Sequence, residues 1–454
     1  MIYSSLKYIK IGSLITCLLF SLIDCQSQSA FVTNKEKPNI IIFYIDDMGY
    51  GQPSCYGGKL METPYIDRLA ENGVRFTDGY VAAPICGPSR VGLMTGRYQA
   101  RTGHDANGRS ADKSLVLDEV TMGELLKKQG YATGIVGKWH LGATERQYLP
   151  MSRGFDHYVG HEGNINEKGG LGYIRGNKSV DFQDHPITSD AWAEESIKFI
   201  DKNKKDPFFL YLAFNAVHTP IAAKEETLQA LSHIRNERER AYAGMIKEAD
   251  EAIGQVMSYL DKANLEENTI IFCISDNGGA FSAADMNGLR GRKWYLFEGG
   301  IRVPYIVQWK GKIEAGQVIE EPVIQLDVLP TALALAGGEP AKGKELDGVN
   351  LLPLLTGQSE SLNRDALYWR FGSQYAIRKG KWKLVKALQT QESPMLVNLE
   401  TDPFEKIDLS DKHPELKQEL QSNWDQWNAK MLPPRWEDRR WDRVEFPKKK
   451  KRKN

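Results

Sequence analysis

The sequence contains few cysteines, and their scarcity limits the kinds of protein that it can encode. Five cysteines occur in 454 residues, and Cys17 and Cys25 lie in or beside an N-terminal apolar segment. The other three, Cys55, Cys86 and Cys273, are too few for a disulfide framework in so long a chain. Two alternatives remain for these thiols: a Cys55–Cys86 disulfide with Cys273 buried in a strand, or one cysteine with a special role.

The sequence also lacks an excess of charge of either sign. Lysine plus arginine equals aspartate plus glutamate at 59 each, which gives a formal net charge of zero. A general nucleic-acid-binding protein would carry a basic excess on one face or domain, so we expect no nucleic-acid partner. With 41% hydrophobic and 26% charged residues, the composition is that of an ordinary globular chain.

The apolar run at the N-terminus, Ile11–Ile23, is too short to span a bilayer comfortably. Because Lys7 and Lys10 precede it, the run is typical of an export signal and predicts a periplasmic location. The signal ends in Leu-Ile-Asp-Cys, which is similar to a bacterial lipobox except that an aspartate replaces a small residue. Ordinary signal cleavage and lipidation of Cys25 therefore remain alternatives, and that lipid would be the expected anchor at the outer membrane.

Short β-branched apolar runs alternate with helical patterns, which predicts an α/β fold: a mostly parallel central sheet between two layers of helices. The predicted strands are Asn39–Ile45, Tyr131–Val136, Phe208–Phe214, Thr269–Ser275 and Val303–Trp309. Two helices have readable starts, one with Pro64 after Thr63 and one with a capping box of Thr121 and Glu124. Apolar residues at three- and four-residue spacing predict a longer helix from Glu237 to Lys262.

After about Gly357 the pattern changes to short runs separated by turn residues, which favours a small antiparallel sheet. These runs are Ala366–Arg370, Gln374–Arg378, Trp382–Val385 and Met395–Asn398, and a helix near Pro414–Lys430 follows them. We therefore divide the chain into a signal peptide at 1–25, a linker at 26–37, a main α/β domain at 38–357, a C-terminal sheet subdomain at 358–447 and a solvated basic tail at 448–454.

Four of the predicted strands end directly before charged or amide side chains. These side chains are Asp46 and Asp47, Lys138 and His140, His218, and Asp276 and Asn277. Ligand sites of open α/β sheets lie outside the carboxyl ends of the strands, so all of them are expected at one edge. Each alone has a structural alternative as a turn former or helix cap, but their convergence favours a functional site.

This set of side chains suits a hard divalent cation. Three carboxylates and an amide oxygen match calcium or magnesium better than zinc, which would favour a histidine beside the aspartates. A cation also explains how Asp46, Asp47 and Asp276 can share a site without repelling one another. Lysines and histidines facing that cation describe a pocket for an anion with tetrahedral oxygens.

The segment Cys86-Gly87-Pro88-Ser89-Arg90 places a cysteine at the start of a predicted helix, where amide dipoles favour negative charge. Alone, this pattern is typical of a thiolate nucleophile with a low pKa. A thiolate beside hard oxygen ligands makes poor chemical sense, however, because soft sulfur does not suit such a metal.

Six motifs in order give the sequence its resemblance to a known family. They are PNIIIFYIDDMGYG, CGPSR with its TGR continuation, GKWHLG, HTP, SDNGG and LRGRKWYLFEGGIRVP, and they span Pro38 to Pro304 before an ending in MLVNLETDPFEKIDLS. The sequence resembles the formylglycine-dependent sulfatases, an arylsulfatase-like family related to alkaline phosphatases. The resemblance implies an alkaline-phosphatase-like α/β/α sandwich with its catalytic domain at 38–357.

The resemblance also implies the chemistry of the site. Cys86 would be oxidised to formylglycine (3-oxoalanine) by a formylglycine-generating or anaerobic maturing enzyme, which reads Pro88 and Arg90. Asp46, Asp47, Asp276, Asn277 and the diol of residue 86 would hold one calcium ion. Arg90 would orient the diol, Lys138 and Lys293 would contact the sulfate oxygens, His140 would lie beside the formylglycine, and His218 would lie near the leaving oxygen.

The resemblance predicts hydrolysis of a sulfuric ester in a sulfated carbohydrate, as in the degradation of algal polysaccharide or glycosaminoglycan. One diol hydroxyl would attack sulfur, His218 or Lys293 would protonate the departing alcohol, and deprotonation by His140 would expel sulfate. Two alternatives remain open. One is a phosphate or phosphonate ester hydrolase of the same superfamily, and the other is a catalytically silent protein that binds sulfated glycan.

Overall fold

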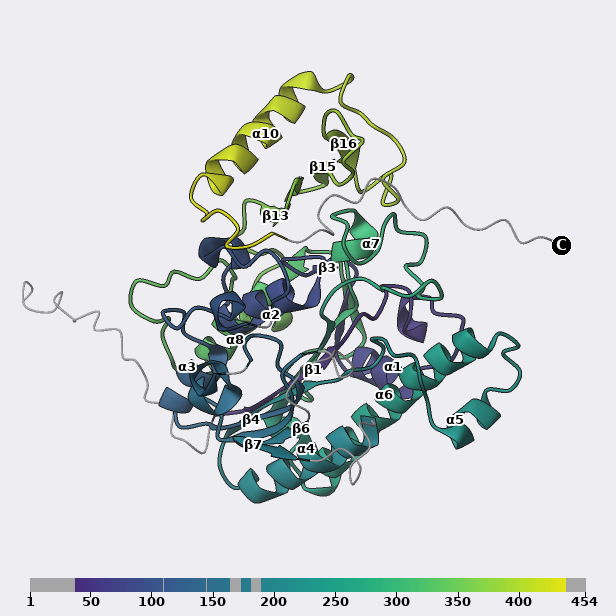
Figure 1. Ribbon diagram of the computed structural model, residues 1–454, viewed down its shortest axis with the longest axis vertical. Coiled ribbons are helices and arrows are strands. Elements are labelled where there is room, and N and C mark those ends of the chain that lie inside the picture. Colours follow the sequence, from purple (N-terminus) through teal and green to yellow (C-terminus); the bar gives the residue numbers. More distant parts are fainter. Residues whose placement is uncertain (1–36, 109, 144, 164–172, 181–188, 438–454) are drawn as a thin grey trace, which may run out of the picture.

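A computed structural model of the protein describes residues 37–108, 110–143, 145–163, 173–180 and 189–437 (Figure 1). The predicted signal peptide, nearly all of the predicted linker and the basic tail lie outside these residues, so the predictions made for them stay predictions. In the described part of the chain, every helix is too short or too polar to cross a membrane.

A ten-stranded sheet forms the centre of the molecule. Its strands, in spatial order, are β11 (Gln317–Ile319), β2 (Val74–Phe76), β10 (Tyr305–Gln308), β9 (Thr269–Ser275), β1 (Asn39–Ile45), β8 (Phe208–Ala213), β4 (Ala132–Lys138), β5 (His157–His161), β6 (Tyr173–Arg175) and β7 (Lys178–Val180). The central strands β9, β1, β8, β4 and β5 are mutually parallel. Their carboxyl ends therefore meet at one edge of the sheet, as predicted.

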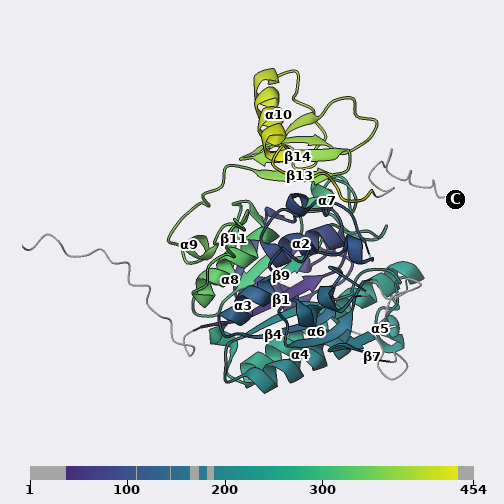
Figure 2. The ribbon, with the colours of Figure 1, turned by 60° about the vertical axis from the view of Figure 1, so that its left-hand side comes forward.

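Helices cover both faces of this sheet and produce two hydrophobic cores (Figures 1 and 2). One face carries α1 (Pro64–Glu71), α4 (Ser189–Asn203) and α6 (Glu237–Lys262), with α5 (Glu225–Ala230) beside α6. The other carries α2 (Cys86–Thr95), α3 (Met122–Lys128) and α8 (Val328–Ala336). Of two short helices, α7 (Glu298–Ile301) lies between β9 and β10 in the chain, and α9 (Leu352–Leu355) follows α8. Burial from both sides explains why β1 reads as an unbroken apolar run instead of an alternating one.

Several elements match their predicted bounds because local signals define them. β1, β9 and α6 begin and end at the predicted residues. The capping box of α3 is formed by two hydrogen bonds: the Glu124 amide donates to Thr121 Oγ1 at 3.2 Å, and the Thr121 amide donates to Glu124 Oε2 at 2.7 Å.

Two expectations need correction. β10 falls within the predicted strand Val303–Trp309, but it runs antiparallel to both of its neighbours, β9 and β2. The chain reaches it from β9 through a long loop and the single turn of α7 and then runs back along β9, with Tyr305 paired with Ile274 and Gln308 with Ile271. The Cys55–Cys86 disulfide is also absent, since Cys55, Cys86 and Cys273 are all free thiols.

The predicted antiparallel sheet follows the main sheet in the chain and lies above it in Figure 1. It consists of β13 (Leu367–Phe371), β14 (Gln374–Lys379), β15 (Trp382–Lys386) and β16 (Met395–Asn398). Alternate side chains face opposite sides: Ile377 and Leu384 pack toward α10 (Pro414–Asn428), whereas Ala376 and Val385 pack toward the main body.

The two parts meet at a buried ionic cluster as well as at apolar side chains. Lys383 of β15 lies 2.7 Å from Glu298 Oε1 of α7 and 2.9 Å from Glu405 Oε1, and all three side chains are fully buried. Nearby, the Trp369 indole of β13 donates a hydrogen bond to the Val81 carbonyl oxygen at 2.8 Å. The small sheet is therefore fixed to the main body through specific polar contacts.

Replacement of Lys383 should destabilise the whole protein. Lys383→Met leaves the Glu405 carboxylate buried without its cation and leaves Glu298 with the longer contact to Arg302 at 3.5 Å. The expected loss is about 3–5 kcal/mol in the free energy of unfolding. Urea denaturation measures this loss. The matched control is Lys381→Met, because the pair of Lys381 with Glu400 is solvent-exposed and worth about 0–1 kcal/mol. Equal losses in the two variants would contradict a stabilising role for the cluster.

Candidate active site

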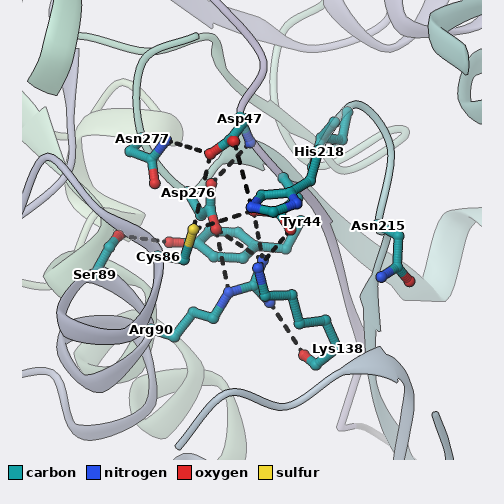
Figure 3. A network of polar contacts seen from close by, with 12 residues as sticks. Tyr44, Asp47, Cys86, Ser89, Arg90, Lys138, Asn215, His218, Asp276 and Asn277 are labelled. Atoms are coloured by element: carbon teal, nitrogen blue, oxygen red, sulfur yellow. Dashed lines mark hydrogen bonds and ion pairs between the residues drawn. The ribbon is translucent and has the colours of Figure 1, made fainter. Parts of the chain in front are cut away.

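The polar residues predicted from the strand ends converge at one edge of the sheet (Figure 3). β1 leads into Asp46 and Asp47, β4 ends at Lys138, β8 precedes the loop that holds His218, and β9 leads into Asp276 and Asn277. All of these side chains except His218, which is mostly buried, are inaccessible to solvent. The structure thus gathers every strand-end residue of the prediction except His140 into one contact network.

Cys86 is the first residue of α2 and lies at the centre of this network. Its Sγ donates to Asp46 Oδ1 at 3.3 Å and accepts from Lys293 Nζ at 3.1 Å. Burial, followed by the charges of Asp276 and Asp46, raises the pKa of the Cys86 thiol well above its usual value. The environment therefore favours the protonated thiol and does not suit the thiolate nucleophile that the helix start alone suggests.

Oxygen ligands crowd around the same sulfur. Ligand atoms of Asp46, Asp47, Cys86 and Asp276 all lie within 4.8 Å of one another. Asn277 donates through Nδ2 to Asp47 Oδ1 at 2.8 Å, but its Oδ1 is buried without a hydrogen-bond partner. A buried carbonyl oxygen without a donor beside three carboxylates fits a hard cation such as calcium, which would satisfy all of them at once.

Three cations lie among these carboxylates. Lys138 Nζ contacts Asp46 Oδ2 at 2.6 Å, and Lys293 Nζ contacts Asp47 Oδ1 at 2.5 Å. The third cation, Arg90, lies 2.8 Å from Asp276 Oδ2. The three positive and three negative side chains balance, so a divalent cation would give the cluster a net positive charge suited to an anionic ester.

The aspartates titrate differently because their neighbours differ. Burial alone would raise the pKa of Asp46, but Lys138, His218 and Arg90 together hold it well below its ordinary value. At Asp276, burial and the negative charge of Asp46 outweigh Arg90 and raise the pKa to about 7. A bound cation would favour the ionised form of every carboxylate here.

His218 points toward the acidic cluster from the loop after β8. Its Nδ1 must donate to the Thr219 carbonyl oxygen at 2.7 Å, which leaves Nε2 facing Asp47 Oδ2 at 3.8 Å. Burial lowers the pKa of His218 below its ordinary value, although the charges of Asp46 and Asp47 act in the opposite direction. A bound sulfate would add a further negative charge and favour the protonated ring.

His140 lies just past the end of β4 in a left-handed backbone conformation, with φ of 60°. Its amide donates to the Glu162 carbonyl oxygen at 2.9 Å, and its Nδ1 is buried without a hydrogen-bond partner. Burial, aided by Lys138 and Arg90, lowers the pKa of His140 well below its ordinary value. Burial therefore favours the neutral form of the ring.

Sequence reasoning missed several residues that support this site. Tyr211 accepts a hydrogen bond from Arg90 at 3.0 Å, Ser89 shares one with Tyr44 at 3.0 Å, and Asn107 Oδ1 accepts from the Gly87 amide at 2.9 Å. Tyr44 and Tyr211 occur inside apolar strands, where a tyrosine usually belongs to the core. A lone Asn107 in a polar loop carries no motif that links it to Cys86.

A pocket of about 150 Å³ opens beside His218. Its other lining residues include Trp192, Asn215, Met245 and Glu248. Trp192 Nε1 donates to Asn215 Oδ1 at 3.2 Å, and Asn215 Nδ2 lies 2.6 Å from His161 Nε2. The pocket therefore combines an aromatic wall with fixed amide and carboxylate groups directly beside the site.

Comparison with known proteins identifies the family to which this chain is similar. A family model described as Sulfatase matches residues 38–338, and one described as N-sulphoglucosamine sulphohydrolase, C-terminal, matches residues 291–430. N-acetylgalactosamine-6-sulfatase of Homo sapiens is 35% identical over 379 residues, which cover 77% of this chain and 71% of the relative. Steryl-sulfatase of Rattus norvegicus is 32% identical over 423 residues, which cover 73% and 72%.

Solved structures agree with the sequence comparisons. The structure of Ps i-CgsB in complex with k-i-k-neocarrahexaose superposes with a TM-score of 0.80 at 35% identity, over 88% of this chain and 94% of that one. The match extends over the central sheet, its helices and the C-terminal sheet, which confirms the predicted fold class. The chain belongs to the sulfatase family and is a sulfuric ester hydrolase.

Proposed function

We propose that the protein removes sulfate from a sulfated carbohydrate, with formylglycine at position 86 and one calcium ion. The observation that carries this proposal is the cluster of hard oxygen ligands and cations that closes around Cys86. The sulfatase family uses a metal and formylglycine, and Asp46, Asp47, Asp276 and Asn277 are the residues that would hold the ion with residue 86. When present, the hydrated aldehyde supplies the nucleophilic hydroxyl and the calcium ion stabilises negative charge on the ester oxygens.

The residues of the chain would divide the remaining work by position. Arg90 donates to Asp276 and to the Lys138 carbonyl oxygen, so it holds the start of α2 against two strand ends. Asp46 already accepts a hydrogen bond from residue 86 and is placed to take its proton. Lys138 and Lys293 would neutralise the sulfate oxygens, and His218 would protonate the departing alcohol.

Two observations support a sugar as that alcohol. The structural neighbour Ps i-CgsB binds k-i-k-neocarrahexaose, and another neighbour, at 26% identity, concerns glycosaminoglycan metabolism. In this chain, the pocket beside His218 is lined by the apolar side chains of Ala222 and Met245 and by the polar side chains of Thr219 and Glu248, a mixture that suits a sugar ring and its hydroxyls. A pocket of this size holds about one ring, being smaller than the roughly 300–1,000 Å³ of drug-sized sites.

The location and maturation of the protein belong to the same proposal. The N-terminal signal would direct the chain to the periplasm, with Cys25 as the site of lipid attachment at the outer membrane. A formylglycine-generating or anaerobic maturing enzyme would be the partner that modifies Cys86. Sulfated polysaccharides released near the cell surface would then be within reach.

Modification of Cys86 is directly testable. Mass spectrometry of the peptide that contains residue 86, from a host with a maturing enzyme, should show the aldehyde or its hydrate. Cys86→Ala should abolish sulfate release and change the melting temperature little, because alanine adds no bulk at this buried position and removes no charge. The control is Cys273→Ala, which alters a free thiol within β9. A fully active preparation with an unmodified thiol would disprove the formylglycine mechanism.

Calcium should stabilise the folded protein. At 100 times the dissociation constant, a ligand of the native state adds about 2.7 kcal/mol to the free energy of unfolding, so thermal unfolding should shift upward with added calcium. Asn277→Leu removes the unpartnered oxygen and should weaken calcium binding in calorimetry. Asp201→Asn, which removes an exposed carboxylate, should leave it unchanged. Binding that is identical in both variants would place the ion elsewhere.

The role of His218 depends on the leaving group. His218→Gln should reduce kcat on a sugar sulfate by about 10²–10⁴-fold, because an alkoxide needs a proton to depart. On an aryl sulfate with an acidic phenol as leaving group, the same substitution should reduce kcat far less. His233→Gln, at an exposed histidine, is the control. Equal losses on the two substrates would assign protonation to another group, with Lys293 as the alternative.

The substrate class itself is tested by a panel of sulfated oligosaccharides with free sulfate as the readout. Aryl phosphate and phosphonate esters serve as the comparison set. Faster turnover of the phosphorus esters would favour the phosphoester alternative, and glycan binding without sulfate release would favour the silent one.

A further inference from the structure

The loop that carries Lys293 is held from three directions. The Lys293 amide donates to the Gly279 carbonyl oxygen at 3.2 Å, next to the Asp276–Asn277 turn. The amide of Trp294 donates to the Pro84 carbonyl oxygen at 2.9 Å, two residues before Cys86. These two bonds fix the loop to the main body, one beside the Asp276–Asn277 turn and one beside the segment that leads into Cys86.

The third hold comes from the C-terminal sheet. Gln374, the first residue of β14, is 2% exposed, and both atoms of its side-chain amide are used. Its Nε2 donates to the Trp294 carbonyl oxygen at 2.9 Å, and its Oε1 accepts from the Leu296 amide at 3.1 Å. One side chain thus makes hydrogen bonds to two peptide groups of the backbone that immediately follows Lys293.

The backbone that Gln374 holds includes a residue in a rare conformation. Trp294 has φ of 78°, a left-handed conformation that is rare for a bulky side chain. Lys293, the residue directly before it, reaches both Cys86 Sγ and Asp47 Oδ1 through its Nζ. A loop with one residue in a costly conformation persists only where surrounding contacts fix it.

We propose that Gln374 is a positioning residue for Lys293, and that through it the C-terminal sheet takes part in catalysis. Its amide fixes the backbone of Trp294 and Leu296, and this backbone determines how far Lys293 Nζ lies from Cys86 Sγ. The proposal rests on the role proposed for Lys293 at the sulfate. The contacts of Lys383, by contrast, lie in the ionic cluster with Glu298 and Glu405 and serve stability.

Gln374→Met tests the proposal, since methionine keeps the length of the side chain and removes both hydrogen bonds. With an aryl sulfate, kcat should fall about 10- to 100-fold, the range expected when a reacting group is misplaced by an ångström or less. KM should change far less than kcat, and the formylglycine content should match that of the wild type. Gln391→Met is the control, because the Gln391 side chain also accepts from two backbone amides, those of Ala387 and Leu388, and makes no bond to the Lys293 loop.

A double-mutant cycle separates positioning from general stability. If Gln374 acts through Lys293, then Gln374→Met should have no further effect on kcat in a Lys293→Ala background. The same factor in both backgrounds, or a loss no greater than that of Gln391→Met, would overturn the proposal. If Gln374→Met does not fold, Gln374→Asn enters the same cycle, since it keeps a neutral amide but is one methylene too short to make both hydrogen bonds.

Failure of this proposal is distinct from failure of the proposed substrate. The cycle uses an aryl sulfate throughout and compares each variant with the wild type. Loss of activity on every sulfated sugar, with the cycle intact on the aryl ester, would reject the carbohydrate substrate and leave the role of Gln374 standing.

Discussion

The ion pair of Arg90 with Asp276 is the contact on which the rest of the site depends. Both side chains are completely buried, at a distance of 2.8 Å. The same guanidinium donates to the Lys138 carbonyl oxygen at the end of β4 and to the Tyr211 hydroxyl in β8, so it joins α2 to three strands. Removal of either charge would leave the other buried without its partner, which is why this pair fixes residue 86 against the sheet.

Much of this architecture follows from local sequence signals. β1, β9 and α6 were predictable because their apolar runs, their helical spacing and the polar residues at their ends agree. The acidic cluster was predictable because parallel strands place their carboxyl ends together, so neighbours in space could be inferred from positions along the chain. The direction of β10 was not, because an apolar run has the same pattern whether the strand is parallel or antiparallel.

Such local signals do not predict the long-range contacts of single polar residues. Gln374 meets Trp294 across 80 positions of sequence, and Asn107 meets Gly87 from a polar loop. A single glutamine or asparagine has no periodicity and no motif, so only the packed structure shows which amide it holds. The sequence predicts the groups that perform the chemistry better than it predicts those that keep them in place.

The complete burial of Cys86, together with the late position of Gln374, has a consequence for the order of events during synthesis. Residue 86 is translated long before β14, and at about 5–20 residues per second the interval is on the order of tens of seconds. The loop after Lys293 lacks the Gln374 amide until β14 has been made. Because residue 86 is completely buried in the folded protein, a maturing enzyme would have to act before the chain has folded around it.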